Sequence, residues 1–274
     1  MRQYPIERHL HFRIPESPRF GPDESLYFRC DTTGNREVWE VPEPNRWPEQ
    51  RTFTGRDVTF FAWSPTGERM AFGMDSEGDE RTQLYCFDGD TETVSRLTDE
   101  PDVVHRWGGW SRDGQRFAYA ANRRQRGVFD VYTQGRLEPC ERARLVYEQT
   151  RPSQVFPAAW GPDNHRLVVL EMHSNYSADL HLVDLDGGTT RTLTSGLDEE
   201  VRYRAVNWGP DGESLYLVTD HDHNWLYAAR LDLATERIEP VVQVDANIES
   251  LVFHRGRERL AYLRNRRGYT DVVA

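Results

Sequence analysis

The sequence contains no lysine, so all 34 of its basic residues are arginine, and they face 45 acidic residues for a formal net charge of −11. An acidic chain lacks the basic surface that sequence-independent nucleic-acid binding requires. The same charge disfavours docking on an anionic membrane. We therefore expect neither nucleic acid nor membrane among the partners of this protein.

Cysteines and long apolar runs are also scarce. Cys30, Cys86 and Cys140 are widely spaced and form no C-x-x-C pair, which is typical of reduced thiols rather than of a disulfide framework. The N-terminal residues lack the apolar core of a secretory signal peptide, and no stretch is long and apolar enough to span a bilayer. These absences predict a soluble, cytoplasmic protein.

Catalytic motifs are missing as well. The chain has no G-x-S-x-G nucleophile elbow and no His-Gly-Gly stretch that could form an oxyanion hole. Ser64 and Ser111 each follow a tryptophan and precede a turn, so we expect them to hydrogen-bond the local backbone. The sequence by itself predicts no catalytic residue, no cofactor and no enzymatic activity for this chain.

What the sequence does contain is an internal repeat of an aromatic residue followed by a tight turn. The copies read WSPTGERMAF, WSRDGQRFAY, WGPDNHRLVV and WGPDGESLYL, with weaker flanking copies FGPDESLYF and FHRGRERLAY. Their first residues are separated by 43, 47, 50, 48 and 45 positions. A period in the forties is typical of a four-stranded propeller blade. We expect the anchor aromatics to pack between neighbouring blades.

The residues around each anchor complete the blade. An apolar strand ends at the aromatic residue, Pro and Gly or Asn form the turn, and alternating strands with polar turns follow. The fold prediction is all-β, a β-propeller of about six four-stranded blades in one domain over residues 1–274. The sixth copy ends within its third strand, so its last blade is incomplete and its edge could mediate self-association. Either residues 4–12 supply the missing strand, or further blades follow in a longer protein, which we favour.

Three stretches carry a family resemblance: RHLHFRIPESPRFGPDESLYF, TTGNREVWEVP and RWPEQRTFTGRDVTFFAWSPTGERMAFGMDSEGDERTQLY. They resemble the N-terminal β-propeller of the prolyl oligopeptidase family of serine peptidases, especially its acylaminoacyl-peptidase and dipeptidyl-peptidase-like members. The W-S-P-D-G motif itself is shared with TolB-like propellers. The resemblance implies that this chain is the N-terminal part of a longer peptidase, whose catalytic residues lie in a C-terminal α/β-hydrolase domain absent here.

Two kinds of candidate site follow from the propeller prediction. The inner strand of each blade lines a central channel, and His105, Arg106, Arg202 and Arg204 fall on or near such strands. Arginines facing a channel could bind a peptide carboxylate or carbonyl groups. Alternating acidic and histidine residues in the segment Asp220–Asn224 could instead suggest a metal site. We interpret that segment as a polar turn and predict no metal site.

The functional hypothesis is a non-catalytic propeller module that gates or binds short peptides for a hydrolase domain outside this chain. Its expected partners are a peptide substrate and that hydrolase domain. The alternative is a free-standing TolB-like propeller that serves as a protein-interaction platform. A nucleophile elbow encoded in the same reading frame would favour the first hypothesis.

Overall fold

The computed structural model describes residues 13–76, 78–194, 200–253 and 259–274. These residues fold into two compact units, Met1–His105 and Arg106–Ala274. Residues 4–12, the predicted donor of a closing strand, lie outside the described residues. Among the residues that are described, no helix is long and apolar enough to cross a membrane, and the three cysteines are buried free thiols, as expected.

The first unit contains two four-stranded antiparallel sheets, each with its strands in chain order. Sheet 1 consists of β1 (Glu16–Phe20), β2 (Leu26–Cys30), β3 (Glu37–Val41) and β4 (Glu49–Gln50). Sheet 2 consists of β5 (Val58–Trp63), β6 (Arg69–Met74), β7 (Gln83–Asp88) and β8 (Thr93–Arg96). Tyr27 and Val38 of sheet 1 pack against Phe61 and Phe72 of sheet 2, which places the core of this unit between the two sheets.

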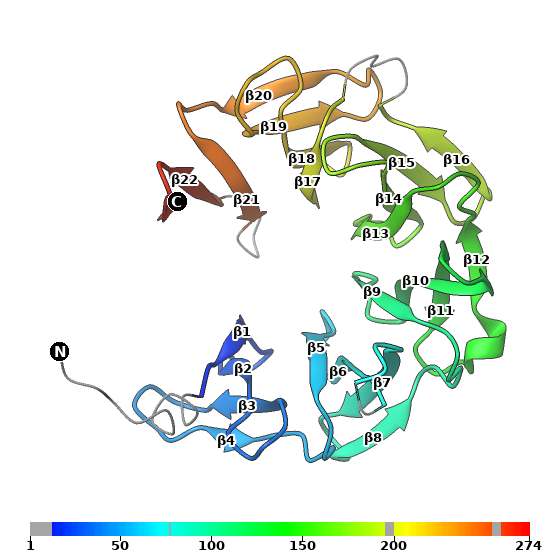
Figure 1. Ribbon diagram of the computed structural model, residues 1–274, viewed down its shortest axis with the longest axis vertical. Coiled ribbons are helices and arrows are strands. Elements are labelled where there is room, and N and C mark those ends of the chain that lie inside the picture. Colours follow the sequence, from blue (N-terminus) through cyan, green and yellow to red (C-terminus); the bar gives the residue numbers. More distant parts are fainter. Residues whose placement is uncertain (1–12, 77, 195–199, 254–258) are drawn as a thin grey trace. The chain divides into compact units, whose positions relative to one another are not determined.

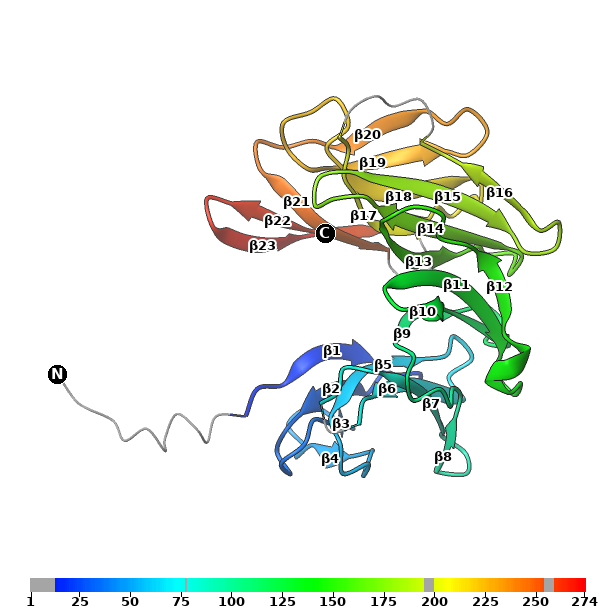
Figure 2. The ribbon, with the colours of Figure 1, turned by 45° about the vertical axis from the view of Figure 1, so that its right-hand side comes forward.

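The second unit contains four further sheets, whose strands are labelled from β9 to β23 in Figure 2. The first of these strands, β9 (His105–Trp110), begins at the unit boundary. Sheet 3 adds β10 (Arg116–Gln125), β11 (Val128–Gly135) and β12 (Arg144–Tyr147), with a short 3-10 helix at Cys140–Arg142. Sheet 4 has β13 (Gln154–Trp160), β14 (Arg166–Met172), β15 (Ala178–Asp184) and β16 (Thr189–Thr192). Sheet 5 has β17 (Tyr203–Trp208), β18 (Ser214–Thr219), β19 (Tyr227–Asp232) and β20 (Ile238–Val242).

Sheet 6 has three strands, β21 (Asn247–Phe253), β22 (Leu260–Arg266) and β23 (Tyr269–Val273). Within the second unit β13 lies beside β17, and β17 lies beside β21, so sheets 4, 5 and 6 meet along their first strands (Figure 1). Six small antiparallel sheets of this kind, the last with three strands, are the blades of a β-propeller. This confirms the predicted fold class and the incomplete last blade. Self-association through β23 stays a prediction.

The anchor tryptophans of the second unit join neighbouring sheets. Trp208 is buried and donates its indole N–H to the Ala159 carbonyl at 3.2 Å, while Trp160 donates to the Gly109 carbonyl at 3.0 Å. In both cases the acceptor belongs to the preceding sheet. Phe20 begins the first copy but is 72% exposed, because its sheet has no preceding sheet within its unit on which to pack.

The turns after the anchors are built around an aspartate. In three copies its Oδ1 accepts backbone N–H groups two residues ahead, from Gln115 to Asp113, His165 to Asp163 and Glu213 to Asp211. The turn also needs a residue with positive φ, which Gly114 and Gly212 provide without strain. Ser111 Oγ donates to Asp113 and accepts the N–H of Arg116, which confirms its predicted structural role.

These turn aspartates make stability depend on pH. Burial alone would raise the pKa of Asp211, but hydrogen bonds from Glu213 N–H and the Ser214 hydroxyl outweigh it and lower that pKa. A lowered folded-state pKa stabilises the protein fully above the ordinary carboxyl range, and this contribution is lost as pH falls through the folded pKa. We expect Asp211→Asn to flatten the fall of the urea midpoint below pH 4. Asp245→Asn, at an exposed position, is the control; an equal effect of both substitutions would contradict this assignment.

Candidate functional site

A polar pocket of about 440 Å³ lies where sheets 3 and 4 adjoin. One wall is the β10–β11 hairpin, Arg124–Val128, and the other is the segment Gln149–Ser153 that leads into β13. Two of its arginines are already paired, Arg124 with Asp130 and Glu148, and Arg151 with Glu171 and Asp179. Arg126 is exposed. Guanidinium groups beside a polar pocket suit carboxylate or carbonyl oxygens of a ligand.

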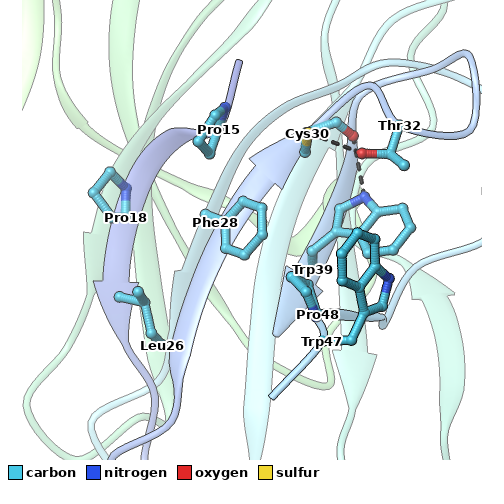
Figure 3. A pocket seen from close by; sticks show the side chains of 9 residues that line it. All are labelled: Pro15, Pro18, Leu26, Phe28, Cys30, Thr32, Trp39, Trp47 and Pro48. Atoms are coloured by element: carbon cyan, nitrogen blue, oxygen red, sulfur yellow. Dashed lines mark hydrogen bonds between the residues drawn. The ribbon is translucent and has the colours of Figure 1, made fainter. Parts of the chain in front are cut away.

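An apolar pocket of about 430 Å³ lies on sheet 1, in the other unit (Figure 3). Figure 3 shows Phe28, Trp39 and Trp47 around it; Pro15, Pro18, Leu26, Cys30, Thr32 and Pro48 complete the lining. Trp39 is fixed by a hydrogen bond from its indole N–H to the Cys30 carbonyl at 3.1 Å, whereas Trp47 is 82% exposed. A wall of aromatic rings and prolines suits an apolar or proline-containing side chain.

His105 lies at the start of β9 and is buried, with 2% of its surface exposed. Its Nδ1 lies 3.0 Å from the Thr82 carbonyl and its Nε2 lies 3.0 Å from Glu100 Oε2. Both ring nitrogens are therefore used to hold the segment between β8 and β9. The geometry gives His105 a local structural role.

Arg106 is the next residue of β9, and its guanidinium stacks on an aromatic ring, with Cζ 3.7 Å from the centre of Phe129. Phe156 lies on a second side at 5.3 Å. Burial lowers the pKa of Arg106, and its Nη1 is buried without a hydrogen-bond partner among the described residues. Arg106 thus packs between side chains of sheets 3 and 4.

Arg202 lies just before the first strand of sheet 5, and Arg204 lies within that strand. Arg202 precedes β17 and donates its backbone N–H and its Nε to the Asp220 carboxylate, at 2.8 and 2.6 Å. Arg204 is within β17 and is exposed, between the buried Tyr203 and the half-buried Ala205. Of the four predicted channel residues, Arg204 offers an exposed guanidinium on a first strand.

The segment Asp220–His223 forms a turn between β18 and β19, as interpreted from the sequence. Asp220 pairs with Arg202, and His223 accepts the backbone N–H of Trp225. The clustered metal-ligand types in the described chain lie elsewhere, at Glu171, His173 and Asp179 of sheet 4. Sequence reasoning missed this group because its members come from two strands and their connecting hairpin.

The fold defines the class of protein, a β-propeller domain, and the described residues include a polar pocket and an apolar pocket. The family model for the prolyl oligopeptidase N-terminal β-propeller domain matches residues 21–273, so the chain belongs to the prolyl oligopeptidase family through that domain. No curated protein matches the chain.

The fold is also similar to a solved structure from a study of two prolyl endopeptidases that addressed inter-domain dynamics in catalysis and specificity. The TM-score is 0.75 at 14% sequence identity, and the match covers 95% of this chain. At that identity the likeness shows the fold. The chain spans 41% of the length of the matched chain.

Proposed function

We propose that this chain is the non-catalytic propeller module of a prolyl-oligopeptidase-like serine peptidase, and that it gates or binds short peptides for a hydrolase domain. The observation that carries the proposal is the match of the family's N-terminal propeller model to residues 21–273. The absence of a nucleophile elbow from the 274 residues supports a non-catalytic role.

Recognition of a short peptide requires a charged or polar side chain that binds a terminal group of the peptide, such as its C-terminal carboxylate. Arg204 is the residue best suited to this, because its side chain is exposed on β17 while its neighbour Tyr203 is buried. A guanidinium presents a planar set of donors that match a carboxylate. We infer that Arg204 contacts the C-terminal carboxylate of a bound peptide.

A binding assay with a fluorescein-labelled octapeptide tests both parts of the proposal. The chain should bind the free-acid peptide about tenfold more tightly than its amidated form, which is the size of one charge-assisted hydrogen bond. Arg204→Ala should remove that difference, and pure protein should not hydrolyse peptide p-nitroanilides. Arg112→Ala, at an exposed turn position, is the matched control.

Two results would overturn the proposal: turnover by pure chain, and equal binding of the two peptides by the unaltered protein. If Arg204→Ala and Arg112→Ala act alike, the guanidinium of Arg204 is not the contact. The reading frame beyond codon 274 supplies separate evidence. A G-x-S-x-G hydrolase sequence there supports the peptidase module, whereas a stop codon followed by an unrelated gene supports the interaction platform.

A further inference from the structure

Three side chains with metal-binding atoms meet at one end of sheet 4. Glu171 of β14 and Asp179 of β15 are direct partners in the strand register, and His173 follows β14 by one residue. One ligand atom from each lies within 4.8 Å of the other two. His173 Nε2 lies 2.9 Å from Asp179 Oδ2. Residues two apart on a strand share a face, which is why Glu171 and His173 act together.

Both carboxylates are oriented by hydrogen bonds to both of their oxygens, including Ser153 to Glu171 Oε1 and His173 to Asp179 Oδ2. Glu171 Oε2 accepts from the Tyr147 hydroxyl at 2.9 Å and lies 3.0 Å from His181 Nε2. Asp179 Oδ1 accepts from the Thr194 hydroxyl at 2.9 Å. The remaining oxygens, Glu171 Oε1 and Asp179 Oδ2, lie on the side of Arg151. Oriented carboxylates of this kind are a usual feature around bound metals.

Arg151 is the cation that now faces these oxygens, and it holds them loosely. Its Nε lies 3.5 Å from Glu171 Oε1 and its Nη2 lies 3.8 Å from Asp179 Oδ2. Its side chain is 58% exposed and lines the polar pocket, together with Ser153, which also donates to Glu171. An exposed arginine can turn into that pocket and open a path to the carboxylates.

A second observation, independent of the cluster, comes from Tyr203 on β17. The tyrosine is 97% buried, since 3% of its surface is exposed, and its hydroxyl has no hydrogen-bond partner among the described residues. Burial raises the pKa of Tyr203, and the charges of Asp179 and Asp220 raise it further. Its strand, β17, contacts β15, which carries Asp179. Buried hydroxyls normally find a partner. A water molecule carried by a metal ion would provide one.

We propose that Glu171, His173 and Asp179 bind a divalent transition-metal ion of the zinc type when Arg151 moves aside. One imidazole and two carboxylates are ligands that Zn²⁺ accepts, with an open position left for water. Metal bonds of about 2.0–2.2 Å require the ligand atoms to move toward a common centre. The pocket beside Arg151 gives that ion access to solvent. This inference does not rest on the peptide-binding proposal.

The test is calorimetric titration of untagged, metal-free protein with Zn²⁺, with Ca²⁺ as a second cation. We expect one saturable Zn²⁺ site and weaker Ca²⁺ binding, because Ca²⁺ requires more oxygen ligands. His173→Gln should weaken Zn²⁺ binding at least tenfold. Arg151→Ala should strengthen it, because the competing guanidinium is removed. His165→Gln is the matched control, a more exposed histidine that also pairs with an aspartate, at 2.7 Å.

Circular dichroism of each variant establishes that it is folded before binding is compared. The proposal is wrong if neither the unaltered protein nor Arg151→Ala binds Zn²⁺ at saturation. It is also wrong if Arg151→Ala weakens binding, or if His165→Gln loses as much affinity as His173→Gln. Strengthening by Arg151→Ala separates a metal site from a structural salt-bridge cluster, which gains nothing from the loss of its cation.

Discussion

Replacing Trp208 with alanine is expected to lower the free energy of unfolding by about 3–5 kcal/mol. The indole is 3% exposed and packs with apolar residues of sheets 4 and 5, including Val168 and Leu217. Its N–H reaches the Ala159 carbonyl, and the guanidinium of Arg166 lies over its ring at 4.7 Å. The substitution therefore leaves a cavity between two sheets and removes a bond that joins them. Urea unfolding followed by circular dichroism measures the change.

Two control substitutions separate these contributions. Trp208→Phe keeps much of the ring but removes the N–H, so it should cost about 1–3 kcal/mol, the range for leaving a buried acceptor unpaired. Trp47→Ala removes an indole that is 82% exposed and should leave the urea midpoint nearly unchanged. If Trp208→Ala cost no more than Trp47→Ala, the anchor tryptophan would not hold the sheets together.

The pairing of an anchor with a basic residue of the preceding sheet recurs. Arg116 of sheet 3 lies over Trp160 of sheet 4, and Arg166 of sheet 4 lies over Trp208 of sheet 5. Both arginines stand six residues after the anchor of their own sheet. In these two copies the repeat therefore encodes a contact to the next sheet in addition to its own turn.

Local patterns in the sequence were sufficient to predict the blades, because anchor, turn and alternating strand are set by neighbouring residues. The bounds were less accurate. The alternating run Trp225–Ala228 indicates a third strand of sheet 5, whereas β19 is Tyr227–Asp232. Trp225 belongs to the preceding turn instead, since its backbone N–H bonds the ring of His223. A side chain that captures a backbone donor overrides the alternation on which the prediction depended.

The sites were harder to predict than the fold, because they depend on partners far apart in the chain. The alternating pattern placed His105 and Arg106 near a first strand. It contains no information on their contacts, which are a hydrogen bond between His105 and Glu100 and the stacking of Arg106 on Phe129. The same limit applies to the polar pocket, whose walls come from two segments about 25 residues apart. Arg204 is exposed on β17, but the burial pattern after it does not alternate, because the pairing with β18 shifts between Arg204 and Asn207. Its place in a channel stays a prediction.

A hydrogen-bonding arrangement that recurs in three sheets is absent from the predictions, although a fixed spacing in the sequence indicates it. In three sheets a threonine follows the fourth strand, and its hydroxyl donates to the first polar side chain of the third strand. The same hydroxyl accepts the backbone N–H of the residue after that side chain. We call this the threonine clasp; the pairs are Glu37 with Thr52, Gln83 with Thr98, and Asp179 with Thr194. In each pair the threonine follows by 15 residues. A search for polar residues at that fixed offset would have found all three.

Replacing Glu37 with alanine should destabilise the first unit by about 3 kcal/mol, because Glu37 is the most heavily bonded clasp residue. It is 2% exposed, and its carboxylate accepts from the Thr52 hydroxyl, the Thr54 N–H and hydroxyl, and the Gly55 N–H. Removing the acceptor leaves the buried Thr52 hydroxyl and the half-buried Thr54 N–H without this partner, and each unmet buried donor costs about 1–3 kcal/mol before water enters.

Thermal unfolding and hydrogen exchange of the first unit measure the effect of Glu37→Ala. Glu49→Ala, whose side chain is 59% exposed, is the control and should change stability by less than about 0.5 kcal/mol. Glu37→Gln keeps one acceptor oxygen but adds donors where four donors already converge, so it should fall between the two. If Glu37→Ala left the exchange of the Val38 amide unchanged, the clasp would not be what ties the fourth strand to the third. Faster exchange at Val38 than at Leu84, whose own clasp stays intact, would locate the loss at this sheet.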